Sequence, residues 1–130
     1  MKLTLPWPPA TNNLYTVARG RKIKTKAGRQ YALDVQAAIW SSGYGRRFND
    51  MRVSVCITYH QPTRRNVDLD GRLKAPLDAL TQCGIWADDS QIDRLVVERG
   101  EIVKGGCIEI EIEPYIKLAA ARQPVAVLAA

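Results

Sequence analysis

Five of the thirteen acidic residues in this chain lie within residues 66–92, which hold its densest set of potential cation ligands. Asp68 and Asp70 come directly before an amphipathic run, and Asp89 follows that run in a short loop. If the first two stand in an extended segment, their side chains point the same way. Lys74 then lies one helical turn beyond Asp70 and adds an ammonium group. The pattern predicts a site for a hard cation.

Each of these residues also has a purely structural interpretation. An aspartate near the start of a helix commonly caps free N–H groups and meets the positive end of the helix dipole. Lys74 between Asp70 and Asp78 is compatible with a surface ion-pair ladder, worth about 0.3–0.5 kcal/mol per pair. Asp88 and Asp89 are compatible with a plain turn. Their combination in one short segment, beside a basic half of the chain, favours chemistry.

Charge is distributed unequally along the chain. Residues 1–67 carry twelve Lys and Arg against two acidic residues, whereas residues 68–130 carry seven against eleven. A basic half that holds a polyanion and an acidic half that binds metal explain this asymmetry. Nucleic acid is the preferred partner, because the basic amphipathic helix typical of membrane-surface binding is missing. No acidic residue precedes Asp34, so the basic residues of 19–29 are predicted to contact phosphates.

The bulk composition predicts one soluble globular domain without a membrane span. The chain of 130 residues is long enough for a single core. Its start lacks the features of a signal peptide, and no apolar run approaches the roughly 20 residues that span a bilayer. Cys56, Cys83 and Cys107 have neither zinc nor disulfide spacing, so we expect a cytoplasmic protein. No Gly-rich phosphate loop occurs, and no nucleotide cofactor is expected.

Hydrophobic periodicity predicts the elements that position these residues. The predicted strands are 2–5, 51–59, 92–103 and 107–113, the helices are about 31–43 and 71–83, and a short hairpin lies within 14–25. The last two strands are expected to form a hairpin about Lys104-Gly105-Gly106. Pro76 falls inside the second helix, where it should remove a backbone bond and kink the axis unless the first turn is irregular.

This order of elements predicts an α+β fold, a single domain with one mixed β-sheet and two main helices packed on it. We place the domain at residues 1–115. The Ala-rich C-terminal tail, residues 116–130, shows no useful pattern and is expected to be disordered.

The predicted ligands offer only oxygen donors, which favours Mg²⁺, with Mn²⁺ as the alternative, over zinc. The candidates are Asp68, Asp70, Asp89 and, in addition, Asp88. The number of ions stays open. Lys74 could orient water, neutralise charge on the reacting phosphate, or stabilise the leaving oxygen. Arg64 and Arg65 directly precede the acidic residues, and their planar guanidinium groups suit phosphate oxygens.

Two segments resemble the signature of the RusA family of Holliday junction resolvases: Asp68-Leu-Asp-Gly-Arg-Leu-Lys-Ala-Pro-Leu-Asp-Ala-Leu and Gly84-Ile-Trp-Ala-Asp-Asp-Ser-Gln-Ile. Leu5-Pro-Trp-Pro-Pro, Asn13-Leu-Tyr and Lys104-Gly-Gly are also similar, and the likeness covers about residues 1–115 in the same order. It implies a homodimeric, Mg²⁺-dependent endonuclease that resolves four-way DNA junctions in recombination and repair. It maps the metal-binding acids of the family onto Asp68, Asp70 and Asp89, and its catalytic lysine onto Lys74.

The full set of predicted DNA contacts is Asn13, Tyr15, Arg21, Lys22, Lys24, Lys26, Arg64 and Arg65. A homodimer also has a physical argument, because two strands related by approximate two-fold symmetry need two sites. The chain departs from the family at Gly71, where an Asn often follows the second Asp, and at Pro76. Two alternatives stay open: a nuclease for flaps, forks or other branched DNA, and a junction-binding protein with weak catalysis.

Overall fold

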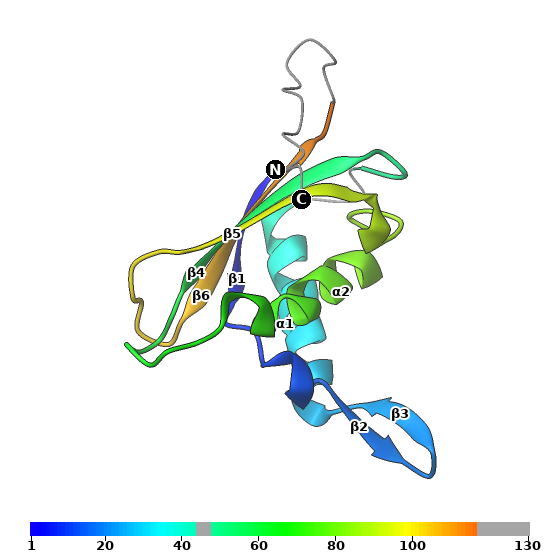
Figure 1. The fold of residues 1–130 in the computed structure, drawn as a ribbon. Coiled ribbons are helices and arrows are strands. Elements are labelled where there is room, and N and C mark those ends of the chain that lie inside the picture. Colours follow the sequence, from blue (N-terminus) through cyan, green and yellow to red (C-terminus); the bar gives the residue numbers. More distant parts are fainter. Residues whose placement is uncertain (44–47, 117–130) are drawn as a thin grey trace, which may run out of the picture.

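The computed structural model describes residues 1–43 and 48–116, in which a four-stranded mixed sheet carries two helices on one face (Figure 1). The strand order is β1-β6-β4-β5. The strands are β1 (Lys2–Pro6), β4 (Val53–His60), β5 (Ile92–Arg99) and β6 (Cys107–Pro114), and the helices are α1 (Lys26–Ser42) and α2 (Lys74–Gln82). The predicted α+β architecture is confirmed. Apart from Ile116, the predicted tail lies outside the described residues.

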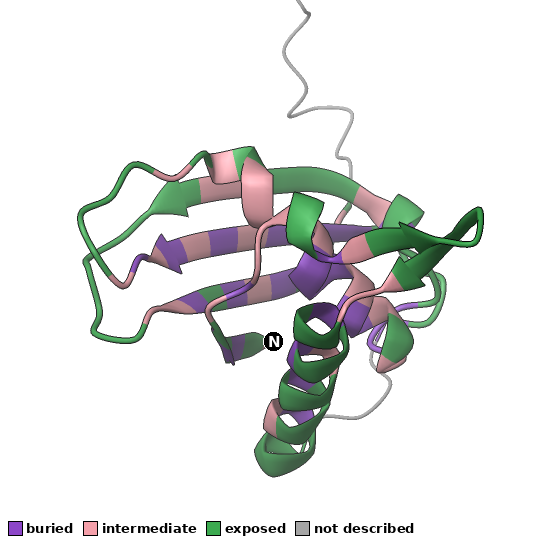
Figure 2. Ribbon diagram, turned by 90° about the horizontal axis from the view of Figure 1, so that it is seen from below, coloured by how far each residue is buried: buried purple, intermediate pink, exposed green. Residues whose placement is uncertain are grey.

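The core lies between the sheet and the helices. Alternate residues of the two central strands are buried with at most 1% exposure: Val53, Val55, Ile57 and Tyr59 of β4, and Ile108, Ile110 and Ile112 of β6. This is the alternation that the sequence predicted. From α1, Tyr31, Val35 and Ile39 are buried at i, i+4 and i+8, and Figure 2 shows this buried stripe turned toward the sheet.

A second, two-stranded sheet projects from the body of the molecule (Figure 1). It is the hairpin of β2 (Tyr15–Ala18) and β3 (Arg21–Lys24). Arg19 and Gly20, between the strands, have φ angles of 54° and 72°, the left-handed conformation that two-residue hairpin turns require. The predicted hairpin is therefore confirmed.

The predicted metal ligands and Lys74 all lie on the connection between β4 and β5. These two strands are parallel, so the chain must cross over from the end of one to the start of the other. The crossover contains a 3₁₀ turn, η2 (Leu69–Arg72), then α2, then a second 3₁₀ turn, η3 (Asp89–Gln91).

The predicted hairpin between the last two strands is wrong. The chain does turn at 104–106, where Gly105 and Gly106 have φ angles of 82° and 72°. However, β4 lies between β5 and β6 and pairs with both. Residues 100–106 pass over the end of β4 instead, and Gly100 N–H bonds to the Tyr59 carbonyl. Turn chemistry predicts that a chain reverses, but not that the flanking strands become neighbours.

The exception stated for Pro76 applies, because an irregular 3₁₀ turn precedes α2. Helix α2 begins at Lys74, later than predicted, so Pro76 is its third residue. The N–H groups of the first helical turn have no partner within the helix, so a proline there removes no bond. Gly84 follows the helix with a φ of 75°, as expected for a residue that ends it.

No helix within residues 1–43 or 48–116 has the length and apolar character needed to cross a bilayer.

Candidate active site

Asp68 and Asp70 occupy different backbone environments at the start of the crossover. Asp68 is extended, with φ −68° and ψ 135°, and immediately precedes η2, whereas Asp70 lies within that 3₁₀ turn. The expected extended segment is therefore correct for Asp68 and wrong for Asp70, because the chain tightens before α2 begins. Both residues are exposed, so each carboxylate is free to turn toward a ligand in solvent.

Lys74 is held by a carboxylate one turn further along α2. Its Nζ lies 3.3 Å from Asp78 Oδ2 and 3.4 Å from Asp78 Oδ1. The hydrogen bond and the charge of Asp78 raise the pKa of Lys74, and the charge of Asp89 adds to this effect. Lys74 is therefore an ammonium group at neutral pH. The turn η3, which carries Asp89, also contacts α2.

Asp78 also joins the hairpin to the crossover. The Tyr15 hydroxyl of β2 donates a hydrogen bond to Asp78 Oδ2 across 3.1 Å. Partial burial and this bond raise the pKa of Tyr15, so the hydroxyl keeps its proton. Lys22 Nζ lies 4.3 Å from the centre of the Tyr15 ring, a cation–π contact, and Lys24 Nζ donates to Gln82 Oε1 of α2. Sequence reasoning had treated Asp78 only as an ion-pair partner.

Asp88 has a structural task of its own. It caps η3: its carboxylate accepts a hydrogen bond from the Ser90 N–H, while Gln91 Oε1 accepts one from the Asp88 N–H at 2.8 Å. These bonds from Ser90 lower the pKa of Asp88. Buried Gln91 also donates to the Met51 carbonyl, which ties the turn to the chain before β4. An Asp followed three residues later by Gln is the signal that would have predicted this capping box.

The predicted ligands do not form a ready-made metal cage. In residues 1–43 and 48–116, no three His, Cys, Asp or Glu side chains gather closely enough to hold an ion by themselves. Asp68, Asp70 and Asp89 are exposed carboxylates of one crossover, the first two at the 3₁₀ turn before α2 and the third at the 3₁₀ turn after it. They fit Mg²⁺, which is typically held by one or two carboxylates together with water and substrate phosphate. They do not fit an ion that requires a closed protein cage.

A cavity of about 630 Å³ lies beside Asp68. Its lining combines this carboxylate with the cations Arg65 and Arg72, and the polar residues Thr11 and Asn12 border it from the N-terminal segment. A cavity lined by one carboxylate and two arginines suits a phosphate that shares a cation with the protein. The structure thus brings predicted DNA contact Arg65 and predicted ligand Asp68 to one cavity.

The other predicted DNA contacts are exposed or half-buried around this region. Asn13 and Arg64 are exposed, and the Asn13 carbonyl accepts a bond from the Thr25 hydroxyl. Lys26 is the first residue of α1 and is also exposed. In the hairpin, Lys22 pairs with Val17 and Arg21 with Ala18, so these two cations point to opposite faces.

Arg72 is a residue that sequence reasoning missed. Its Nη1 donates a 2.6 Å hydrogen bond to the Pro8 carbonyl, and its guanidinium lies 5.2 Å from the centre of the Trp7 ring. Trp7 in turn meets Tyr59 edge to face, with 5.6 Å between ring centres. Arg72 therefore connects η2 to the opening Pro-Trp-Pro-Pro segment and to the core. Only the fold places residues 64 positions apart in contact.

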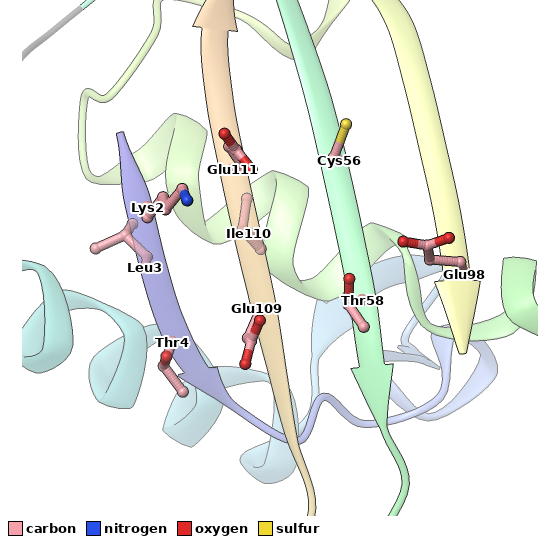
Figure 3. Close-up of a pocket in the computed structure, with 9 residues that line it drawn as sticks. All are labelled: Lys2, Leu3, Thr4, Cys56, Thr58, Glu98, Glu109, Ile110 and Glu111. Atoms are coloured by element: carbon pink, nitrogen blue, oxygen red, sulfur yellow. The ribbon is translucent and has the colours of Figure 1, made fainter. Parts of the chain in front are cut away.

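A different cavity, of about 430 Å³, opens on the sheet face away from the helices (Figure 3). It is lined by Lys2, Leu3, Thr4, Cys56, Thr58, Glu98, Glu109, Ile110 and Glu111. None of the predicted site residues belongs to it. His60, at the end of β4, lies 3.3 Å from Glu109 and bonds to the Glu101 carbonyl, consistent with the structural role expected for it.

Known proteins are similar in sequence to most of this chain. The family model described as endodeoxyribonuclease RusA matches residues 6–113, which include every predicted site residue. The crossover junction endodeoxyribonuclease RusA of enterobacteria phage 82 is 39% identical over 110 residues, which cover 85% of this chain and 91% of the relative. The enzymes of the same name from Escherichia coli K12 and Shigella sonnei are each 38% identical over the same shares.

Proposed function

The chain belongs to the RusA family of endodeoxyribonucleases, and on that basis we propose how its residues cut a DNA junction. It is a crossover junction endodeoxyribonuclease, a hydrolase that resolves Holliday junctions. The family match over residues 6–113 carries this conclusion. We assign the activity to a domain of residues 1–115, with residues 116–130 as a tail outside it. A cytoplasmic location is part of the proposal, since Cys56, Cys83 and Cys107 are free thiols.

In this proposal Asp68, Asp70 and Asp89 hold Mg²⁺, with Mn²⁺ as the alternative. When bound, the ion supplies a Lewis acid that polarises the phosphate and lowers the pKa of a ligated water. Asp68, Asp70 and Asp89 are exposed, so each carboxylate could ligate an ion that is shared with water and a DNA phosphate. Asp88 stays with its turn and is not a ligand, because its carboxylate caps η3.

Lys74 acts on the scissile phosphate as an ammonium group. The hydrogen bond and charge of Asp78 raise its pKa, which favours the protonated form at neutral pH and argues against a role as general base there. A water molecule forms the new P–O bond and gives up a proton to solvent. The P–O bond to the leaving sugar oxygen breaks, and that oxygen, on which negative charge grows, takes up a proton from solvent. An ammonium placed beside it donates hydrogen bonds to the developing charge. The expectation that Lys74 orients water is less favoured, because that role does not need a positive charge.

The DNA backbone is proposed to run from the hairpin to the cavity beside Asp68. Lys22 and Lys24 lie on the hairpin face that bears Tyr15, toward α2, and would contact phosphates on the approach. Arg65 lines the cavity and would hold the phosphate next to the scissile one. Such contacts position the strand without reading its sequence.

We also propose that the enzyme acts as a homodimer. A four-way junction is resolved by two cuts in strands related by approximate two-fold symmetry. One chain carries one crossover with one Lys74, so a pair of chains related by a two-fold axis supplies the two sites.

Asp70→Asn tests the proposal. The amide keeps the size of the carboxylate but ligates Mg²⁺ poorly, so cleavage of a four-way junction should be lost. Binding of the same junction in EDTA should stay within about twofold of wild type, because a ligand change leaves the phosphate contacts intact. Asp34→Asn, a matched loss of an exposed carboxylate on α1, should cut normally.

Wild-type cleavage by the Asp70→Asn variant would contradict this assignment. The alternative of a junction-binding protein with weak catalysis has one observation in its favour, the lack of a preformed cage in the described residues. It predicts binding without cutting in Mg²⁺ or Mn²⁺. Flap, fork and junction substrates compared at matched salt distinguish a resolvase from a general branched-DNA nuclease.

A further inference from the structure

The ammonium of Lys74 needs an anchor if it is to meet one oxygen atom. Its side chain is 42% exposed, and a lysine so exposed has four rotatable bonds and many orientations available to it. Asp78, at 21% side-chain exposure, contacts the ammonium through both carboxylate oxygens, at 3.3 and 3.4 Å. Asp78 is thus the better fixed partner of the two.

Asp78 has a second hydrogen-bond partner, which lies outside the helix. Tyr15 Oη donates to Asp78 Oδ2 from the hairpin, 63 residues away in the sequence. The Tyr15 ring also lies under the Lys22 ammonium, at 4.3 Å. A continuous series of contacts therefore runs from a predicted phosphate-binding lysine on the hairpin, through Tyr15 and Asp78, to the ammonium at the start of α2.

We propose that Asp78 is the positioning residue for Lys74, and that Tyr15 couples this pair to the DNA-binding hairpin. The inference rests on the proposed function, in which Lys74 meets the leaving oxygen. Asp78 itself touches neither DNA nor metal. A phosphate bound at Lys22 fixes the hairpin, the hairpin fixes Tyr15, and Tyr15 holds the Asp78 carboxylate in the orientation that aims Lys74.

An ordinary surface ion pair would make the same contacts without this consequence. Lysine and aspartate four residues apart on a helix often pair, and such pairs generally contribute little. A merely structural pair changes stability slightly and leaves turnover unaffected. A positioning pair changes turnover while junction affinity stays constant, because small displacements of a catalytic group lower the rate steeply.

The experiment uses the full chain with Asp78→Asn, Tyr15→Phe and the double variant, and Asp34→Asn as the control. Asp34 is also an exposed helix carboxylate with a side-chain partner four residues away, Gln30. Single-turnover cleavage and junction affinity in EDTA are measured separately. We expect Asp78→Asn to lower the cleavage rate about tenfold, with affinity within about twofold of wild type. Tyr15→Phe should lower the rate by a smaller factor, and the double variant should be no worse than Asp78→Asn.

The pH profile gives a readout that a structural role does not move. Removing the Asp78 charge removes the main cause of the raised pKa of Lys74. The alkaline fall in cleavage rate should therefore begin at a lower pH in Asp78→Asn than in wild type. Asp78→Glu, which restores a carboxylate, should recover part of the rate and return the alkaline fall in cleavage rate to a higher pH.

An unchanged or faster rate in Asp78→Asn, or an equal loss in Asp34→Asn, would overturn the inference while leaving the enzyme a resolvase. A loss of rate matched by a loss of junction affinity would overturn it as well. If the wild-type chain cuts no junction, the proposed function fails and the inference fails with it. The wild-type rate thus separates the two failures.

Discussion

The guanidinium of Arg72 lies over the Trp7 ring, 5.2 Å from its centre, while its Nη1 bonds to the Pro8 carbonyl. These contacts fix the 3₁₀ turn that carries Asp70 against the opening segment of the chain. Since Trp7 packs on buried Tyr59, these contacts also connect the turn to the hydrophobic core. The proposed metal-binding turn thus gains rigidity from Trp7 and Tyr59, which have no part in the proposed chemistry.

Arg72→Ala should therefore lower both stability and cleavage. We expect a loss of about 2 kcal/mol in the free energy of unfolding, from one charged hydrogen bond and one cation–π contact. Chemical denaturation and single-turnover cleavage measure the two effects. Arg72→Lys, which keeps a cation but not the planar fork, should fall between alanine and wild type. Arg94→Ala, which removes an arginine bonded to Ser54 on β4, is the control and should leave cleavage unchanged.

Gly71 is a place where a side chain fits. A Cβ added there would meet only Asp68 Cβ, at 3.8 Å, which is an ordinary contact. Gly71→Ala should raise the free energy of unfolding by up to about 1 kcal/mol, because it restricts the unfolded chain. Gly71→Asn, the residue that the family resemblance implies, should also raise the cleavage rate severalfold at limiting Mg²⁺. Equal rates for the alanine and asparagine variants would show that the amide has no role.

Variants of Asp88 distinguish a role in capping η3 from a role as a metal ligand. Asp88→Ala removes the acceptor for the Ser90 N–H, so η3 should loosen and cleavage should fall as Asp89 loses its fixed position. Asp88→Ser restores a good capping oxygen without a carboxylate and should retain most of the cleavage. A metal ligand would instead fail in both variants. Cleavage at saturating Mg²⁺ and thermal denaturation provide the measurements.

The cap of Asp88 also has a defined pH dependence. Hydrogen bonds from Ser90 lower its pKa in the folded chain. A group of this kind contributes its full stability above its ordinary pKa, and that contribution disappears as the pH falls through the lowered value. Wild type should therefore lose more stability than Asp88→Ser over that acidic range. Paired denaturation curves at neutral and acidic pH provide the comparison, and parallel losses in both proteins would contradict it.

Lys22 should contribute to affinity through a phosphate. Lys22→Gln should weaken junction binding at low salt and lower the slope of log K against log [salt] by about 0.9, the value for one phosphate contact. Lys2, on the sheet face away from the helices, is the matched control. Binding measured in EDTA at several salt concentrations decides the point. Equal slopes for Lys22→Gln and wild type would show that Lys22 does not contact a DNA phosphate.

Gly28 is required by close packing at the base of the hairpin. A Cβ there would lie 2.9 Å from the Leu14 carbonyl oxygen, a backbone atom that cannot move alone. Gly28→Ala should therefore destabilise the chain by about 1 kcal/mol even though alanine favours helix formation. Ala27→Gly, at the exposed neighbouring position, measures the propensity effect without the clash. A more stable Gly28→Ala variant would show that the hairpin base adjusts freely.

The elements with one strong local pattern could be predicted from the sequence. Strict alternation from Val53 to Tyr59 defined β4, and the burial of those side chains followed from it. Helical spacing also predicted α1, although the helix begins at Lys26, five residues before the predicted start. Turn residues predicted the hairpin at Arg19 and Gly20, because their effect is local. The order of strands could not be predicted, because which strand lies beside β4 depends on packing across the whole chain.

In the candidate site, too, local features could be predicted from the sequence and long-range contacts could not. Residue type and spacing were enough to select Asp68, Asp70, Asp89 and Lys74, whose roles stay predictions until variants are measured. The bond between Tyr15 and Asp78 joins positions 63 residues apart, and no local pattern contains it. The start of α2 was misplaced because apolar spacing continued backwards through Leu73 and did not distinguish a 3₁₀ turn from an α-helix.

The hairpin forms a sheet of its own, with no ladder to the four-stranded sheet. Its length and sequence can therefore drift without disturbing the register of β1, β4, β5 or β6. A longer or differently charged loop in place of Arg19 and Gly20 would alter which DNA shapes are accepted, while Tyr15 keeps its hydrogen bond to Asp78 of the crossover. The tip of the hairpin can thus set substrate range separately from the link at its base that reaches Lys74.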